Sequence, residues 1–128
     1  MVGEQGRILI LEDDVSGVVI RFNLQRAGFE ALLARNETEA WSLLQQQEFD
    51  LLIAEGQMPD VSGLGFCRRV RQSARLAELP IVLLTDGGRD GEPDLQEVAP
   101  LEIVYRPFKP CTLIDRMPAF LAMAPVPA

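Results

Sequence analysis

The sequence predicts an α/β sandwich built on a parallel β-sheet. Five short apolar runs alternate with longer amphipathic or polar stretches, at residues 7–11, 30–34, 50–54, 80–84 and 102–105. The first, third and fourth runs are apolar at successive positions, which is typical of strands buried on both faces between two layers of helices. A chain of 128 residues is long enough for one such domain.

The stretches between these runs carry helical signals. We expect helices near residues 14–27, 36–47, 62–75, 92–99 and 110–122. Gly28 is well placed just after the end of the first helix, and Asn36 followed by Glu39 is typical of a helix start. With right-handed crossovers, this alternation favours a flavodoxin-like (βα)5 three-layer sandwich with a five-stranded parallel sheet in the order 2-1-3-4-5.

Two segments depart from the regular pattern. Residues 86–93, "DGGRDGEP", hold three glycines and a proline, so the fourth helix should be short, late or mobile. Pro118 should kink or end the last helix. We expect one domain over residues 6–122, between an N-terminal tail at 1–5 and a proline-containing tail at 123–128.

The composition argues against several classes of function. Asp and Glu outnumber Lys and Arg by 19 to 12, and the net charge of −7 disfavours direct binding to nucleic acid or to an anionic membrane. The chain has no histidine, which removes histidine bases and histidine metal sites. Its two cysteines, Cys67 and Cys111, lie outside any CxxC motif. We see no signal peptide and no apolar run of membrane-spanning length, and therefore expect a cytoplasmic protein.

Charged and hydroxyl side chains follow four of the five predicted strands. In chain order they are Glu12, Asp13, Asp14, Glu55, Thr85, Asp86 and Arg106. Because α/β sheets bind ligands at the carboxyl ends of their strands, we expect these side chains to form one site. Carboxylates suit Mg²⁺, while a hydroxyl and a cation beside them could hold phosphoryl oxygens and leave one carboxylate as the nucleophile.

Four motifs occur in order between about residues 6 and 122: "ILILEDD", "DLLIAEGQMPDVSG", "PIVLLTD" and "YRPFKP". Together they resemble the receiver (CheY-like) domain of bacterial two-component response regulators. The resemblance implies an acidic pair that binds Mg²⁺ and a carboxylate that takes a phosphoryl group from a histidine kinase. It further implies a hydroxyl and a lysine that hold the phosphate, and an aromatic residue that swings inward.

Transferred by position, the acidic pair is Glu12 and Asp13, and the Gln57 carbonyl is the third possible metal ligand. The phosphoacceptor of the family lies four residues before the proline of a Met-Pro turn. Counted back from Pro59, that place holds Glu55 instead of aspartate.

The positions that the resemblance assigns to phosphate contact and switching also depart from the family pattern. Thr85 supplies the expected hydroxyl, but Arg106 stands where the lysine normally precedes "PF". Ile103 replaces the swinging aromatic residue, and Asp86 fills a position that is usually small.

These departures point to a degenerate receiver. Glutamate extends its carboxylate by about 1.5 Å relative to aspartate, and phosphoryl transfer is sensitive to such displacement. Arg106 keeps its proton and pairs readily with carboxylates, so we expect an ion pair between Glu55 and Arg106. Asp86 would add repulsion to an incoming phosphate. We therefore expect a receiver that acts through protein–protein interaction without phosphorylation, and weak or absent Mg²⁺ binding.

We expect the partner to be a sensor histidine kinase or a downstream effector, and the chain could also form a homodimer. Two alternatives stay open: a conventional phospho-accepting receiver that tolerates the substitutions, and a small flavodoxin-like enzyme or nucleotide-binding module. The second is disfavoured because "EDDVSGV" is acidic where a phosphate loop needs free backbone amides. We therefore do not expect an enzyme.

Overall fold

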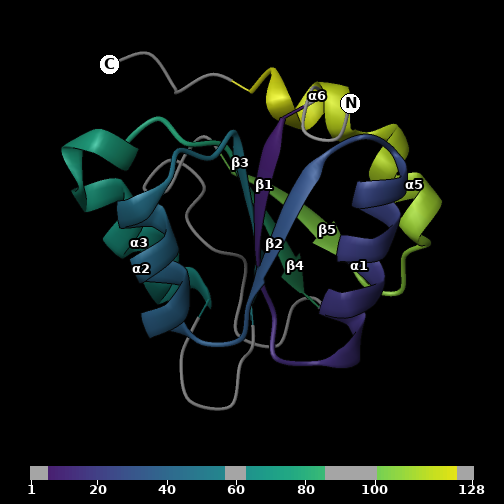
Figure 1. Ribbon diagram of the computed structural model, residues 1–128, viewed down its shortest axis with the longest axis horizontal. Helices are drawn as coiled ribbons and strands as arrows, with labels where there is room; N and C mark the ends of the chain where they lie inside the picture. Colours follow the sequence, from purple (N-terminus) through teal and green to yellow (C-terminus); the bar gives the residue numbers. More distant parts are fainter. Residues whose placement is uncertain (1–5, 57–62, 86–100, 124–128) are drawn as a thin grey trace.

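A computed structural model describes residues 6–56, 63–85 and 101–123. Its five strands are parallel and lie in the order β2-β1-β3-β4-β5 (Figure 1). Their bounds are β1 Arg7–Leu11, β2 Glu30–Ala34, β3 Leu51–Glu55, β4 Ile81–Thr85 and β5 Leu101–Tyr105. The predicted strand order and direction are confirmed. The third and fourth strands lie one residue later than predicted, so Glu55 and Thr85 are the last residues of their strands.

Helices cover both faces of this sheet. Their bounds are α1 Val15–Arg26, α2 Glu37–Gln46, α3 Gly63–Gln72, the 3₁₀-helix η1 Ala74–Leu76, α5 Pro110–Asp115 and α6 Met117–Leu121. Figure 1 shows α2 and α3 on one side of the sheet and α1, α5 and α6 on the other. The three-layer sandwich predicted from the sequence is therefore confirmed.

The two sides of the sheet carry separate apolar cores. In β1, Leu9 and Leu11 belong to the cluster under α2 and α3, whereas Ile8 and Ile10 belong to the cluster under α1, α5 and α6. Successive side chains of a strand point to opposite faces, so an uninterrupted apolar run supplies both cores. This arrangement confirms that the apolar run at residues 7–11 is buried on both faces.

The helix ends follow the local signals in the sequence. The Asn36 side chain accepts a hydrogen bond from the backbone N–H of Glu39 at 2.8 Å and so caps α2. Gly28 follows the end of α1 with a φ of 99°, a left-handed conformation that glycine adopts without steric cost.

Two helices are shorter than the hydrophobic pattern predicts. The third was expected to reach residue 75, but α3 ends at Gln72 and the 3₁₀-helix η1 follows it. The last was expected over 110–122 with a kink or end at Pro118, and it is divided into α5 and α6 at Arg116. A proline lacks the N–H of a helical hydrogen bond and its ring clashes with the preceding turn, which accounts for the division.

Several expected features lie outside the described residues. They are the helix near 92–99, the glycine-rich stretch at 86–93, the tail at 1–5 and all but the first residue of the tail at 123–128. Among the residues that are described, no helix combines the length and the apolar character needed to cross a membrane.

A glycine allows α1 to lie close to the end of β1. A Cβ atom added to Gly17 would lie 2.9 Å from Cβ and Cγ of Glu12 and 2.9 Å from Cδ1 of Leu33. Such distances are shorter than real Cβ contacts, so any larger residue would push α1 away from Glu12. Gly17 therefore contributes to the position of the acidic residue that follows β1.

We expect Gly17→Ala to lower the free energy of unfolding by about 1–2 kcal/mol, because the overpacking cost exceeds the gain in helix propensity. Urea unfolding measures the change. Gly65→Ala is the matched control, because Gly65 is an exposed glycine inside α3; this substitution should be neutral or stabilising. Equal effects of the two substitutions would contradict the role assigned to Gly17.

Candidate functional site

Three charged side chains meet at the carboxyl edge of the sheet. Glu12 directly follows β1, and its backbone N–H donates to the Ala34 carbonyl at the end of β2 at 3.0 Å. Glu55 ends β3 and Arg106 follows β5, where the Arg106 backbone N–H donates to the Thr85 carbonyl at 2.8 Å. The sheet register therefore brings residues from distant parts of the sequence to one place.

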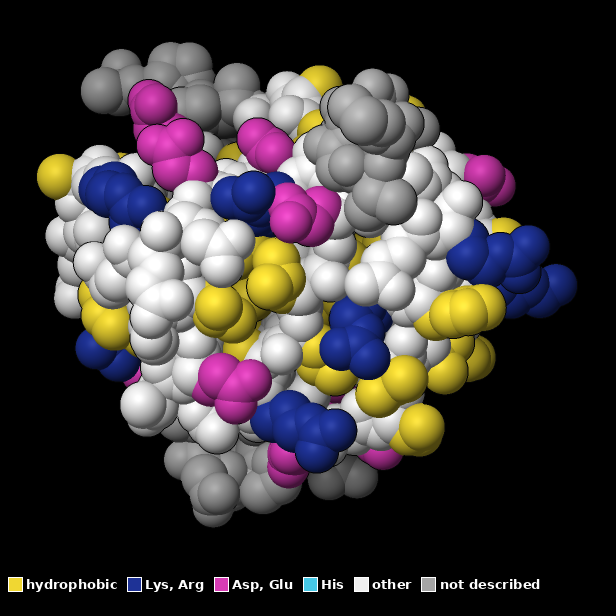
Figure 2. Space-filling view, viewed as in Figure 1, with side chains coloured by type: hydrophobic (Ala, Val, Ile, Leu, Met, Phe, Trp, Pro, Cys, Tyr) yellow, Lys and Arg dark blue, Asp and Glu magenta, His cyan; other side chains and the backbone are white. Residues whose placement is uncertain are grey.

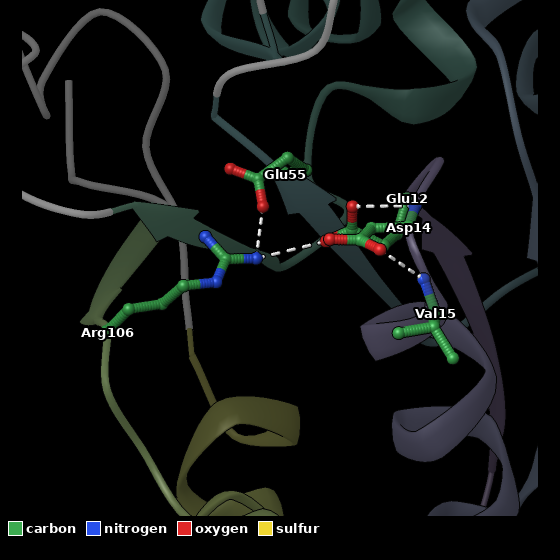
Figure 3. Close-up of polar contacts among 5 residues, drawn as sticks. All are labelled: Glu12, Asp14, Val15, Glu55 and Arg106. Carbon is green, nitrogen blue, oxygen red and sulfur yellow. Dashed lines mark hydrogen bonds and ion pairs between the residues drawn. The ribbon is translucent and has the colours of Figure 1, made fainter.

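Arg106 binds both of the buried carboxylates. Its Nη2 atom donates to Oε2 of Glu12 at 3.0 Å and also contacts Oε2 of Glu55 (Figure 3). Both glutamates are buried, while about a quarter of the Arg106 side chain is exposed. The ion pair between Glu55 and Arg106 that the sequence suggested is present, and Glu12 is a second partner in it.

Asp14 contacts the second carboxylate oxygen of Glu12. Its backbone N–H donates to Oε1 of Glu12 at 3.2 Å, and its side chain accepts from the backbone N–H of Val15 at 2.6 Å, which caps α1. The sequence interpretation placed Asp14 near the site but gave it no role. An aspartate directly before a helical pattern is an N-cap signal, so this role could have been found.

Burial changes the acidity of Glu12. Removal from water raises the pKa of Glu12 from its ordinary value of 4.5 to about 7. A side-chain hydrogen bond with Glu55 and the charge of that carboxylate also raise this pKa, whereas the Asp14 N–H and Arg106 lower it. Near neutral pH, the protonated and ionised forms of Glu12 therefore coexist.

The remaining predicted site residues differ in their exposure and in their place in the fold. Asp13 is exposed, in contrast to its buried neighbour Glu12. Thr85 ends β4, and its Cβ lies 3.5 Å from where a Cβ on Gly56 would stand. Ile103 pairs with Leu83 and packs against the core under α2 and α3. Two further site residues, Gln57 and Asp86, lie outside the described residues.

The buried carboxylates of the site already have a cationic partner in this chain. The Arg106 guanidinium pairs with both Glu12 and Glu55, and its single positive charge offsets one of these two buried carboxylates. Asp13, the second member of the acidic pair, lies at the surface. Within residues 6–56, 63–85 and 101–123, no group of three or more His, Cys, Asp or Glu side chains could hold a metal ion.

The raised pKa of Glu12 predicts a pH-dependent stability. The folded state binds this proton more tightly than the unfolded state, so stability should fall as pH rises from about 4.5 through 7. This one proton contributes at most about 1.4 kcal/mol per pH unit to the slope of the free energy of unfolding against pH. Urea unfolding between about pH 5 and pH 8 measures it. Glu12→Gln keeps a neutral hydrogen-bonding group, and its curve should lack this contribution; parallel curves for the two proteins would refute the assignment.

Comparisons with known proteins identify the family of the chain. The family model of the response regulator receiver domain matches residues 8–117. The phosphate regulon transcriptional regulatory protein PhoB of Rhizobium meliloti is 36% identical over 124 residues, which cover 92% of this chain and 53% of PhoB. The chemotaxis protein CheY1 of Helicobacter pylori is 30% identical over 118 residues, which cover 88% of this chain and 95% of CheY1. The chain therefore spans about half of PhoB and nearly all of CheY1.

A solved structure shows the same architecture. The chemotaxis response regulator CheY4 of Vibrio cholerae matches with a TM-score of 0.82 and 25% sequence identity, over 94% of this chain and 99% of that one. The shared strand order, the position of the acidic site at the strand ends and the family match over most of the chain lead to one conclusion. The chain belongs to the response regulator receiver domain family of two-component signal transduction.

Proposed function

We propose that this receiver domain signals without phosphorylation of its acceptor position and acts through protein–protein interaction. The observation that carries this proposal is the contact of one Arg106 nitrogen with both Glu12 and Glu55. The carboxylate that stands where the family has its phosphoacceptor is thus already engaged by a permanent cation.

Two physical arguments support this proposal. A nucleophilic carboxylate must approach phosphorus along a defined line, and Glu55 is longer than aspartate by about 1.5 Å. The guanidinium of Arg106 stays charged and neutralises Glu55, so it lowers the electron density that an attacking oxygen needs. A phosphoryl group would have to displace this ion pair before it could react.

The kind of partner follows from the family. Receiver domains interact with histidine kinases and downstream effectors, and we propose a protein of one of these classes as the partner here. The net charge of −7 supports a domain that does not itself bind nucleic acid. We propose no enzymatic activity for the domain, and its location in the cytoplasm stays a prediction.

A phosphodonor experiment tests the central proposal. The protein is incubated with a small-molecule phosphodonor and Mg²⁺, and its intact mass is measured. We expect no phosphate adduct on the wild-type protein. We expect an adduct on Glu55→Asp combined with Arg106→Lys, because this variant restores both the length of the acceptor and the point charge of lysine.

The single variants separate the two causes. An adduct on Glu55→Asp alone would show that the length of Glu55 is decisive. An adduct only on the double variant would show that Arg106 also blocks the reaction. A phosphate adduct on Glu55 of the wild-type protein would overturn the proposal and favour the conventional receiver.

We also propose weak or absent Mg²⁺ binding, because Arg106 supplies the positive charge at the site. Isothermal titration calorimetry of the wild-type protein should show no saturable Mg²⁺ binding at physiological concentrations. The matched variant is Asp13→Ala, which removes an exposed carboxylate of the acidic pair. Tight binding by the wild type that is lost in Asp13→Ala would contradict the proposal.

A further inference from the structure

Three arginines of α3 and η1 make contacts inside the molecule. Arg69 and Arg71 belong to α3, and Arg75 belongs to η1. Arginines at this spacing on a helix could form an open basic face, but these guanidinium groups reach α2 and the segment before β4. Figure 2 shows the Lys and Arg side chains of the displayed face as separate groups, several of them beside acidic side chains. The arginines therefore connect elements of the fold.

Arg75 binds the last turn of α2. Its Nη1 atom donates to the Leu44 carbonyl at 2.5 Å, and its Nη2 atom donates to the Gln47 carbonyl at 3.3 Å. The last carbonyls of an α-helix have no partner within the helix, and the helix dipole favours a cation beside them. Arg75 therefore completes the C-terminal end of α2 from a different element of the chain.

Arg69 binds the other end and the middle of the same helix. Its Nη1 atom donates to Oε1 of Glu37, the first residue of α2, at 2.8 Å. Its guanidinium lies over the Trp41 ring at 4.1 Å from the ring centroid. The Trp41 ring also meets the Phe66 ring of α3 edge to face, with centroids 6.3 Å apart. Helix α2 is thus held at its start, middle and end by α3 and η1.

Arg71 fastens the segment that follows α3. Its Nη1 atom donates to the Leu76 carbonyl at 3.1 Å, and its Nη2 atom donates to the Leu79 carbonyl at 2.5 Å. Burial lowers the pKa of the Arg71 guanidinium to about 10, so the group stays charged at neutral pH. One charged side chain therefore closes the turn between α3 and β4.

This set of contacts covers a thiol. Cys67 is fully buried in the core under α2 and α3, one helical turn before Arg71. Burial raises the pKa of the Cys67 thiol to about 12, while the charge of Arg71 lowers it. Because the thiolate is the reactive form, Cys67 is unreactive as long as it stays buried. The other cysteine, Cys111, is exposed.

We propose that Arg69, Arg71 and Arg75 form an arginine lock that joins α2, α3 and η1 into one rigid layer, and that release of this lock exposes Cys67. The two apolar cores consist of different residues on opposite sides of the sheet. The α2–α3 side can therefore loosen while the core under α1, α5 and α6 stays packed. Once Cys67 meets water, the neighbouring charge of Arg71 favours its thiolate. The fold thus holds a second conformational state, and a reactive thiol marks it.

Thiol labelling tests the proposal. A chain with Cys111→Ser retains Cys67 as its one thiol, and iodoacetamide labelling without denaturant is followed by intact mass. Arg75→Met in this background should raise the labelling rate at least about tenfold, because the closed state loses two charge-assisted hydrogen bonds. Arg75→Lys keeps the charge without the planar fork, so its rate should lie between the two. Arg35→Met is the matched control, since it removes an exposed arginine directly after β2 and should leave the rate unchanged.

A second buried thiol separates local release from unfolding of the whole domain. Met117→Cys, combined with Cys67→Ser and Cys111→Ser, places a thiol in the core under α1, α5 and α6, where Met117 is fully buried. Local release exposes less surface than complete unfolding. Labelling of Cys67 should therefore be faster than labelling at position 117 and should rise less steeply with urea.

Two results would overturn the proposal. Equal rates and equal urea slopes at positions 67 and 117 would show that Cys67 is exposed only when the whole domain unfolds. Equal labelling of Arg75→Met and Arg35→Met would show that the arginine lock does not control the exposure of Cys67. None of these variants alters the acidic site, so the outcome does not depend on the function proposed for it.

Discussion

The contact of Arg106 with two buried carboxylates is the interaction on which the site depends. Buried carboxylates are costly unless they are paired, and here one guanidinium serves both. Removal of the guanidinium would leave two acidic side chains facing each other with little water between them. The same contact joins the ends of β1 and β3 to the residue after β5. A change in the charge of any of these three residues would therefore also change the geometry of this edge of the sheet.

Helix α1 connects this site to the surface of the molecule. On its inner side, Asp14 caps the helix and donates to Glu12, while Gly17 allows the helix to approach that side chain closely. On its outer side the same helix exposes Val15, Val18, Val19 and Phe22. A shift of α1 would therefore change the surroundings of Glu12 and the position of these exposed side chains together.

Much of this fold could be predicted from the sequence, because apolar runs without alternation have few alternatives to a buried parallel sheet. The pairing of Glu55 with Arg106 was also predictable, since both residues follow strands and carry opposite charges. The inclusion of Glu12 in that pair was not predicted. Glu12 and Asp13 are adjacent acids in the sequence, and only the direction of the chain after β1 decides which one is buried.

Other features depend on close packing that a sequence pattern does not contain. The role of Gly17 becomes clear only when the distance between α1 and Glu12 is known. Helix α3 also ends at Gln72, earlier than the end at residue 75 that was expected from the sequence. Two positions used in the functional hypothesis, Gln57 and Asp86, lie outside the described residues and stay predictions from the sequence.

The shared guanidinium also constrains how related sequences can diverge. Positions 12, 55 and 106 are far apart in the chain, yet a change at any one of them alters the electrostatic environment of the other two. Viable descendants of this sequence should therefore change these positions as a set, and the three columns of a family alignment should covary. Evolution of this pocket would then proceed by coordinated replacement, with few tolerated intermediates between the arginine-centred arrangement and any other.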